Sequence, residues 1–591
     1  MRPTLETAFR ELAEHPLAAL SPFLESVSFP EGSCIFTAGS AADACYLIDE
    51  GRVRIELDRS ELDSDDVLAV LDAGAIIGEL SLLDGLPRSA SAYAHTSVRA
   101  RKLTLDGIDL IAERDPTLLA TLYAALGRNA ALKLRHTNER LADAVFSHSD
   151  PEVEELVARA AAAQAAVADW PEARVDELLL GMAQAVAAAA RELAEATVRA
   201  TRMGNAPDKT VKNLFASMGV YRAIEGKPAS GVTHADDARR ITEMACPAGV
   251  VFGLVPVTNP VATAIFKSLI AVKGRNALIL SFHRRAQPLA SMVGELIHDA
   301  LRRAGAPTDL VQWVRGGASR RKTELFMRHA KVSLVLATGG ASMVKAAYSS
   351  GTPAIGVGPG NAPVLVCADA DVEHAAQSVV LGKSFDNGLI CGSENNLVAV
   401  DAVRDAFVDA LVRAGAAVLT PDEAARFAAV VVDPAGGHLR AEAVGQTAQA
   451  IAGFVGLRRP YAIRVIVVPA SGVGRENAFA GEKMAPILSL FSVPDEDAGI
   501  ALSRSLLERE GTGHTAIVHT RSRATAERFA AAMPASRVLV NSPGAHGIMG
   551  FTTALEPSLT LGCGTFGGNS TTDNVTYRHL LNVKRVAEFL L

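Results

Sequence analysis

The sequence has few cysteines, and no spacing among them suggests pairing. Its six cysteines are scattered over 591 residues, at positions 34, 45, 246, 367, 391 and 563. This pattern argues against a disulfide framework and against a zinc site, and it is typical of reduced thiols in a cytoplasm. We therefore expect a cytoplasmic protein without a metal site.

The chain also lacks long apolar runs and an excess of positive charge. Charged residues interrupt the alanine-rich stretch around 156–200 every few positions, so no run reaches the length of a membrane span. The first residues lack the basic segment and apolar core of a secretory signal, so we expect neither export nor a membrane partner. The net charge of −7 gives no electrostatic footprint for nucleic acid.

The length of the chain predicts three or more domains, because one hydrophobic core does not extend over 591 residues. Residues 25–105 contain short β-forming runs separated by turns, which predicts a small sandwich or jelly roll. Residues 107–145 predict a helix, in which Pro116 suits a first turn. Together, residues 1–145 form a predicted first domain, and a linker is expected over 146–170, with its polar part at 147–151.

The pattern beyond the linker is that of α/β structure. An alanine-rich helical region extends to about residue 230, and short apolar strand runs then alternate with helical runs up to residue 400. This alternation predicts a doubly wound α/β fold. The predicted strand runs are 250–255, 277–280, 334–337, 354–357 and 364–367.

A candidate phosphate cradle lies at residues 78–91 of the first domain. Gly78 would let the backbone approach an anion, and Glu79 could accept a hydrogen bond from a ribose hydroxyl. The next residues can form a short helix whose N-terminus faces anions, Arg88 supplies a bidentate cation, and Ser89 adds a hydroxyl and an amide. The alternative is an ordinary exposed arginine in a Pro-Arg turn.

This segment resembles the phosphate-binding cassette of the cyclic nucleotide-binding domain family, over about residues 15–140. The resemblance implies that a cyclic nucleotide binds to Gly78, Glu79, Arg88 and Ser89, and the Arg-Ser-Ala order favours cAMP over cGMP. In this family the following long helix caps the base, and its polar candidates here are Arg128, Asn129 and Arg135. The α/β sequence that follows, in place of a helix-turn-helix, argues against a transcription factor.

A candidate nucleophile is Cys391, in the segment 384–394. It lies among small and polar residues, just after Asn387-Gly388. A thiolate nucleophile needs this setting, because the incoming carbonyl requires room and backbone N–H groups can hold the developing charge.

Three other segments fit the same chemistry. Asn259 follows a predicted strand, where its carboxamide could donate to an oxyanion, although an asparagine before proline is equally a helix N-cap. Thr338-Gly339-Gly340 ends another strand and could face a pyrophosphate. The glycine-rich turn 356–363, which contains Gly358 and Gly360, also follows a strand, and such turns are often only tight connections.

Together these segments closely resemble the CoA-acylating aldehyde dehydrogenases, particularly the aldehyde-oxidising half of bifunctional alcohol/aldehyde dehydrogenases, over about residues 170–591. The matching segments are 255–260, 267–285, 356–363, 385–394 and 561–569. The resemblance implies an aldehyde dehydrogenase fold in residues 171–591. Its Rossmann-like cofactor and oligomerisation parts would lie at about 171–360 and 555–591, and its catalytic part at about 361–554.

The resemblance also implies roles for single residues. Cys391 would be the nucleophile and Asn259 the oxyanion donor, while Glu482 would hold the nicotinamide ribose. His514, in Gly-His-Thr, matches an acylating-type motif, although a surface or N-cap histidine fits that position nearly as well. The cofactor turns would contribute Thr338, Gly339, Gly340, Gly358 and Gly360. NAD, with NADP as the alternative, and coenzyme A as co-substrate are the implied small molecules, in a dimer or larger homo-oligomer.

One departure from the hydrolytic members of the superfamily predicts the reaction. Those enzymes carry Glu-Leu-Gly-Gly-Lys where this chain has Val357-Gly-Pro-Gly-Asn. Val357 cannot take a proton from water, so a thioester on Cys391 would last long enough for the CoA thiol to attack it. We therefore expect reversible oxidation of a short-chain aldehyde to acyl-CoA, regulated by a cyclic nucleotide.

Three alternatives remain open at this stage. The chain could be a cyclic nucleotide-binding signalling or scaffold protein with a non-catalytic dehydrogenase-like domain. The enzyme could be active while its N-terminal domain is an oligomerisation module with a dead pocket. A thiol hydrolase is also conceivable, although it leaves the nicotinamide-type turns unexplained.

Overall fold

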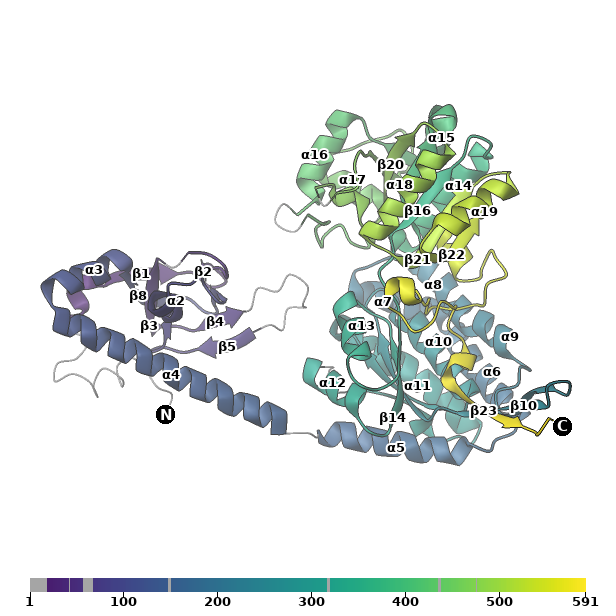
Figure 1. The fold of residues 1–591 in the computed structure, drawn as a ribbon, viewed down its shortest axis with the longest axis horizontal. Helices are drawn as coiled ribbons and strands as arrows, with labels where there is room; N and C mark the ends of the chain where they lie inside the picture. Colours follow the sequence, from purple (N-terminus) through teal and green to yellow (C-terminus); the bar gives the residue numbers. More distant parts are fainter. Residues whose placement is uncertain are drawn as a thin grey trace. The chain divides into compact units, whose positions relative to one another are not determined.

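The computed structural model describes residues 19–41, 43–56, 67–146, 150–315, 319–433, 437–474 and 476–590, without the side chains of 67, 68, 132 and 135–146. The chain divides into two compact units, residues 1–148 and 149–591 (Figure 1).

The first unit is a β sandwich with helices, as the sequence predicts. Within the described residues its strands form two four-stranded antiparallel sheets, in the orders β1-β8-β3-β6 and β2-β7-β4-β5. Apolar residues of these strands pack into two clusters, one of which also includes the helices that follow. The strands are β1 (Glu25–Phe29), β2 (Cys34–Phe36), β3 (Ala44–Glu50), β4 (Val53–Glu56), β5 (Val67–Leu71), β6 (Ile76–Ile77), β7 (Ser91–Ala94) and β8 (Val98–Thr104).

The prediction of a single helix over 107–145 is wrong in one respect, because the structure has two helices there. These are α3 (Leu105–Arg114) and α4 (Pro116–Phe146), while α2 (Glu79–Asp84) is the short helix predicted in the phosphate cradle. Asp115 separates α3 from α4, since a residue before proline is driven away from helical angles. Its side chain then accepts a hydrogen bond from the Leu118 amide in the first turn of α4.

The second unit begins with helices. Most of the linker predicted over 146–170 is helical in the structure: α5 (Pro151–Val167) buries Val153, Val157 and Ala160 in the core of this unit, so these residues do not act as a linker. The polar residues 147–149 lie outside the described residues. The helices that follow are α6 (Glu172–Ala188), α7 (Ala190–Thr201), α8 (Ala206–Leu214) and α9 (Val220–Ile224).

A five-stranded parallel sheet, in the order β13-β12-β11-β14-β15, forms the centre of residues 250–356. It consists of β11 (Val250–Val255), β12 (Ala277–Phe282), β13 (Val311–Trp313), β14 (Val332–Ala337) and β15 (Ala354–Gly356). Its helices are α10 (Pro260–Lys273), α11 (Gln287–Arg303), α12 (Arg320–Arg328) and α13 (Ala341–Tyr348). Helices α5 and α10 both pack against β12. The predicted α/β class is confirmed here.

A second parallel sheet has seven strands in the order β18-β19-β20-β17-β16-β21-β22. It consists of β16 (Ala362–Val366), β17 (Glu394–Val400), β18 (Ala416–Val418), β19 (Val465–Pro469), β20 (Ile487–Val493), β21 (Gly513–His519) and β22 (Ala535–Val540). Its helices are α14 (Val372–Ser384), α15 (Asp401–Arg413), α16 (Pro421–Val431), α17 (Ala448–Phe454), α18 (Glu496–Arg509), α19 (Arg523–Ala532) and α20 (Gly544–Ile548). The chain passes from the first sheet to the second through the glycine-rich turn between β15 and β16.

A small antiparallel sheet joins the C-terminal segment to the middle of the chain. Strand β10 (Ile241–Pro247) pairs on one side with β9 (Gly231–Asp236) and on the other with β23 (Leu581–Ala587). This sheet exposes four apolar side chains, Val232, Met244, Val583 and Val586.

Candidate active site

The candidate nucleophile follows a strained turn. Between α14 and β17, three consecutive residues have left-handed backbone angles, with φ of 45° at Asp386, 56° at Asn387 and 74° at Gly388. Such angles cost about 1–2 kcal/mol for each residue other than glycine, so contacts elsewhere must stabilise this turn. Cys391 comes three residues later and is partly exposed.

His514 lies directly beside the nucleophile. Its Nε2 is 3.1 Å from the Cys391 Sγ, and its Nδ1 is 2.9 Å from the Thr515 hydroxyl. His514 is fully buried at the start of β21, so the alternative of a surface histidine is wrong. The structure thus brings together two of the predicted residues that lie 123 positions apart.

Burial sets the protonation of this pair. It raises the pKa of Cys391 to about 12, assisted by the nearby Glu482 and Cys563, and it lowers the pKa of His514 to about 3, assisted by the positive charge of Arg537. At neutral pH the pair is therefore a thiol and a neutral imidazole. A neutral Nε2 can accept the thiol proton while Nδ1–H donates to Thr515.

The glycine-rich turn passes against the nucleophile. A side chain at Gly360 would place its Cβ 1.6 Å from the Cys391 carbonyl oxygen, so only glycine fits. The Gly358 amide donates to the Cys563 Sγ at 3.4 Å. The predicted contact of these two glycines with a cofactor stays a prediction; in the structure they lie against two cysteines. Sequence reasoning assigned no chemistry to Cys563, and only its place in a matching motif could have indicated this position.

Glu482 lies on the other side of the same turn. Its Oε1 accepts a hydrogen bond from the Gly360 amide at 3.3 Å. Burial, and then the charge of Glu510, raise the pKa of Glu482 to about 8, so this carboxyl is mostly protonated at neutral pH.

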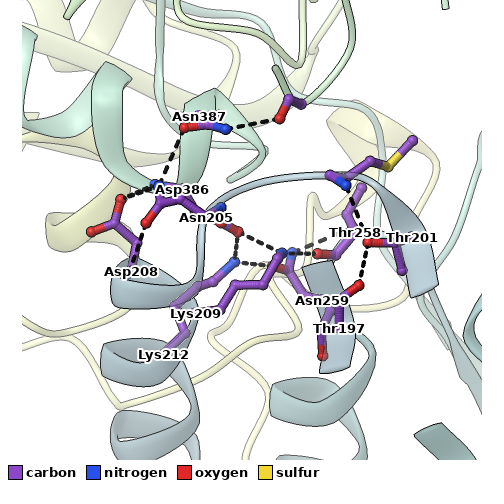
Figure 2. Close-up of polar contacts among 12 residues, drawn as sticks. Thr197, Thr201, Asn205, Asp208, Lys209, Lys212, Thr258, Asn259, Asp386 and Asn387 are labelled. Atoms are coloured by element: carbon purple, nitrogen blue, oxygen red, sulfur yellow. Dashed lines mark hydrogen bonds and ion pairs between the residues drawn. The ribbon is translucent and has the colours of Figure 1, made fainter. Parts of the chain in front are cut away.

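Asn259 lies at the carboxyl end of β11 and precedes α10, but its side chain does not cap the helix. The N-cap alternative therefore does not explain its carboxamide. Lys212 from α8 donates instead to the Asn259 Oδ1, and Lys212 and Lys209 both form ion pairs with Asp386 of the strained turn (Figure 2). Sequence reasoning missed both lysines, although their three-residue spacing on a helix signals a common face.

The carboxyl end of β14 fits a dinucleotide. The Thr338 hydroxyl is buried and has no hydrogen-bond partner among the described residues. Gly340 is the N-cap of α13, and a Cβ there would meet no atom within 4 Å. An unsatisfied hydroxyl beside a helix N-terminus, at the carboxyl edge of a parallel sheet, can donate to a pyrophosphate, and the contact of Thr338, Gly339 and Gly340 with a cofactor stays a prediction.

In the first unit the cradle arginine is buried. Arg88 is only 3% exposed, which rules out the exposed-turn alternative. Its guanidinium donates to the Gly78 carbonyl at 2.9 Å, the Ala44 carbonyl at 2.6 Å and the Asp43 carboxylate at 3.0 Å. Its Nε is buried without a hydrogen-bond partner in the described part of the chain, and this donor suits an anion.

Glu79 is also buried and has a partner that the sequence did not indicate. Lys133 of α4 donates to its carboxylate at 2.5 Å and to the Ile76 carbonyl at 2.6 Å. Ser89 is exposed. Of the predicted base-capping residues, Asn129 is buried and Arg128 is exposed, whereas the side chain of Arg135 lies outside the described residues.

Two kinds of feature are absent from the described residues. No group of three or more histidine, cysteine, aspartate or glutamate side chains is arranged to hold a metal ion in that part of the chain. None of the helices described has the length and apolar character to cross a membrane.

Known proteins match both units. Residues 131–552 match the aldehyde dehydrogenase family, and residues 26–115 match the cyclic nucleotide-binding domain. The bifunctional aldehyde-alcohol dehydrogenase AdhE of Escherichia coli K12 is 39% identical over 442 residues, which are 74% of this chain and 49% of that protein. The chain thus spans about half the length of this relative.

Two other relatives match over nearly their whole length. The sulfoacetaldehyde dehydrogenase (acylating) of Cupriavidus necator is 39% identical over 73% of this chain and 88% of that protein. The crystal structure of an acetylating aldehyde dehydrogenase from Geobacillus thermoglucosidasius has a TM-score of 0.72 and 38% identity, and the match covers 74% of this chain and 97% of that one. Both resemblances drawn from the motifs are thereby confirmed. The chain carries a cyclic nucleotide-binding domain ahead of an aldehyde dehydrogenase domain, and it belongs to the aldehyde dehydrogenase family.

Proposed function

We propose that the chain is a cytoplasmic, CoA-acylating aldehyde dehydrogenase that converts a short-chain aldehyde to acyl-CoA, reversibly, through a thioester on Cys391. The single observation that carries this proposal is the 3.1 Å contact between the Cys391 Sγ and the His514 Nε2. The names of the acylating and acetylating relatives support the same reaction class.

In the first step His514 takes the Cys391 proton, and the sulfur forms a bond to the aldehyde carbon. The carbonyl oxygen becomes an oxyanion, which the Asn259 carboxamide and the Cys391 amide stabilise by donating hydrogen bonds. A nicotinamide dinucleotide, when bound, supplies the acceptor for the hydride that leaves this carbon. Thr338, Gly340 and Glu482 would hold it. The acyl group then remains on the sulfur as a thioester, and His514 releases the first proton to solvent before the second step.

In the second step the CoA thiol displaces Cys391. His514 takes the proton of the CoA thiol, the CoA sulfur forms a bond to the acyl carbon, and the Cys391 sulfur leaves and regains a proton from His514. Water is a poor competitor, because Val357 offers no base and the raised pKa of Glu482 keeps that carboxyl mostly protonated at neutral pH.

The test is a panel of short aldehydes assayed for NADH or NADPH formation with and without CoA. We expect CoA-dependent reduction of NAD, or of NADP, that disappears in Cys391→Ala. The absence of CoA-dependent reduction with every aldehyde and both cofactors would overturn the assignment and favour a non-catalytic scaffold.

Regulation by a cyclic nucleotide is the second part of the proposal. The buried, partly unsatisfied Arg88 guanidinium supports an anion site in the first unit, with cAMP as the preferred ligand. Regulation requires that the nucleotide bind two states of the enzyme with different affinity. Calorimetry with cAMP and cGMP tests binding, and kcat/KM with and without saturating nucleotide tests regulation. Identical values at proven saturation would remove the regulatory claim but leave the catalytic one.

The proposed assembly is a homo-oligomer, dimeric or larger. We expect the small antiparallel sheet β9-β10-β23 to form the contact between subunits. Its strands β10 and β23 expose the apolar side chains Met244, Val583 and Val586. Light scattering after size exclusion tests it: a monomer at micromolar concentration contradicts this part.

A further inference from the structure

Helix α8 carries two buried lysines whose roles differ. Lys209 and Lys212 lie three residues apart on one face of this helix, and both donate to the same oxygen of Asp386, Oδ2 (Figure 2). Lys209 is 3% exposed and Lys212 is 2% exposed. Their second contacts separate them: Lys209 donates to the Thr258 backbone carbonyl at 2.9 Å, whereas Lys212 donates to the side-chain oxygen of Asn259.

The contact with Lys212 fixes which way the Asn259 carboxamide faces. An ammonium group has three donors and no acceptor, so it can pair only with the carboxamide oxygen. The Asn259 Nδ2 must then point to the opposite side, where one of its hydrogens donates to the Thr258 hydroxyl at 3.3 Å. Among the residues that the structure describes, the second Nδ2 hydrogen has no acceptor, so it is left for an incoming oxygen.

The charge of Lys212 also makes this amide a stronger donor. A positive charge beside the carboxamide oxygen polarises the group and makes its N–H groups stronger hydrogen-bond donors, more so in a buried site. Two ammonium groups share the single carboxylate of Asp386, and the Asp208 carboxylate also acts on Lys209. Burial, and then the adjacent Lys212, lower the pKa of Lys209 to about 8.

Asp386 links this arrangement to the nucleophile segment. Its Oδ1 accepts a hydrogen bond from the Asn205 amide at 3.0 Å, and its own amide donates to Asp208 at 2.8 Å. These contacts fix the strained turn that precedes Cys391. The carboxylate that anchors Lys212 therefore belongs to the segment that positions the thiol.

We propose that Lys212 is a positioning residue for the aldehyde dehydrogenase reaction: it orients and polarises the Asn259 carboxamide so that Nδ2 faces the oxyanion, from an anchor on Asp386 of the nucleophile segment. The inference rests on the proposed function, because it presupposes that Asn259 donates to the oxyanion.

Lys212→Met and Lys209→Met form a matched pair of variants. Both remove a buried ammonium from α8 and from the same Asp386 oxygen, but only Lys212→Met removes the partner of Asn259. We expect Lys212→Met to lower kcat for CoA-dependent aldehyde oxidation about 10²-fold with KM for the aldehyde little changed. We expect Lys209→Met to lower kcat less than about tenfold at a similar loss of Tm. Equal effects of the two substitutions would overturn the proposal and leave Lys212 a structural residue.

A double-mutant cycle with Asn259→Ala gives the second readout. If Lys212 acts through Asn259, then Lys212→Met has no further effect on kcat once Asn259 is alanine, and additive losses contradict the inference. Full activity of Asn259→Ala alone would instead overturn the oxyanion role in the proposed function, so the two failures are distinguishable.

Lys212→Gln covers the case in which Lys212→Met does not fold. Glutamine keeps a polar group in the cluster but can present either its oxygen or its nitrogen to Asn259, so it neither fixes the carboxamide nor charges it. We expect a loss of kcat similar to that of Lys212→Met. A folded Lys212→Gln enzyme with the kcat of the parent protein would refute the role of Lys212.

Discussion

The contact between Cys391 and His514 makes a quantitative prediction about the resting nucleophile. Burial raises the pKa of Cys391 to about 12 and lowers that of His514 to about 3. A raised thiol pKa means that the protonated form dominates below it, so at pH 7.5 only about one thiol in 10⁴ to 10⁵ is ionised. Catalysis therefore needs His514 to take the proton as the sulfur attacks.

The perturbation is His514→Gln, which keeps a polar side chain but cannot accept a proton. The expected loss of kcat is about 10²–10⁴-fold, the usual contribution of a positioned general base. The matched control is His519→Gln, because His519 is a second buried histidine on β21 and lies at the far end of that strand from His514. Its substitution should lower Tm without a comparable loss of kcat.

The protonation state itself is measured by alkylation of the thiol in the absence of cofactor. A thiol with a pKa of about 12 reacts about tenfold faster for each unit of pH, with no plateau up to about pH 9. A resting thiolate–imidazolium pair would instead give a plateau below about pH 7. Such a plateau, or a His514→Gln enzyme whose kcat stays within tenfold of the parent, would refute this reasoning.

Three further predictions concern the surroundings of the nucleophile and the nucleotide site. As pH rises through the Glu482 pKa of about 8, this carboxyl ionises and can act as a base for water. NADH formation without CoA should therefore rise above pH 8 in the parent enzyme and stay flat in Glu482→Gln. Gly360→Ala should lower kcat at least about 10²-fold, because its Cβ would displace the nucleophile's carbonyl, whereas Gly453→Ala, with no atom within 4 Å, should leave kcat unchanged. Arg88→Lys removes the guanidinium fork and should weaken cAMP binding about 10-fold or more in calorimetry, while Arg99→Lys, at an exposed position on β8, should not. Unchanged affinity of Arg88→Lys would place the nucleotide elsewhere.

The sequence predicted what local patterns determine. The apolar run 250–255 coincides with β11, since β-branched and apolar residues bounded by glycine and proline leave little choice of boundaries. The cradle at 78–91 was predictable for the same reason: glycine, acid, short helix and arginine lie within one segment. One local signal was overlooked: Asp115 precedes a proline, which was visible in the sequence, and it interrupts the helix predicted over 107–145.

The contacts that complete the site were beyond sequence patterns because they join distant segments. Lys212 and Asp386 lie 174 positions apart, and nothing in the helical pattern of α8 says which carboxylate its lysines will meet. Lys133 reaches Glu79 across 54 positions in the same way. Protonation states were also beyond sequence patterns. The pKa of Cys391 depends on its burial in the fold, which residue type and spacing do not specify.

The most direct test of the central claim is mass spectrometry of the enzyme after reaction with an aldehyde and NAD in the absence of CoA. We expect an acyl group on the peptide that contains Cys391, and its release as acyl-CoA when CoA is added. An acyl group on Cys563 instead, or undiminished CoA-dependent turnover in Cys391→Ala, would contradict it.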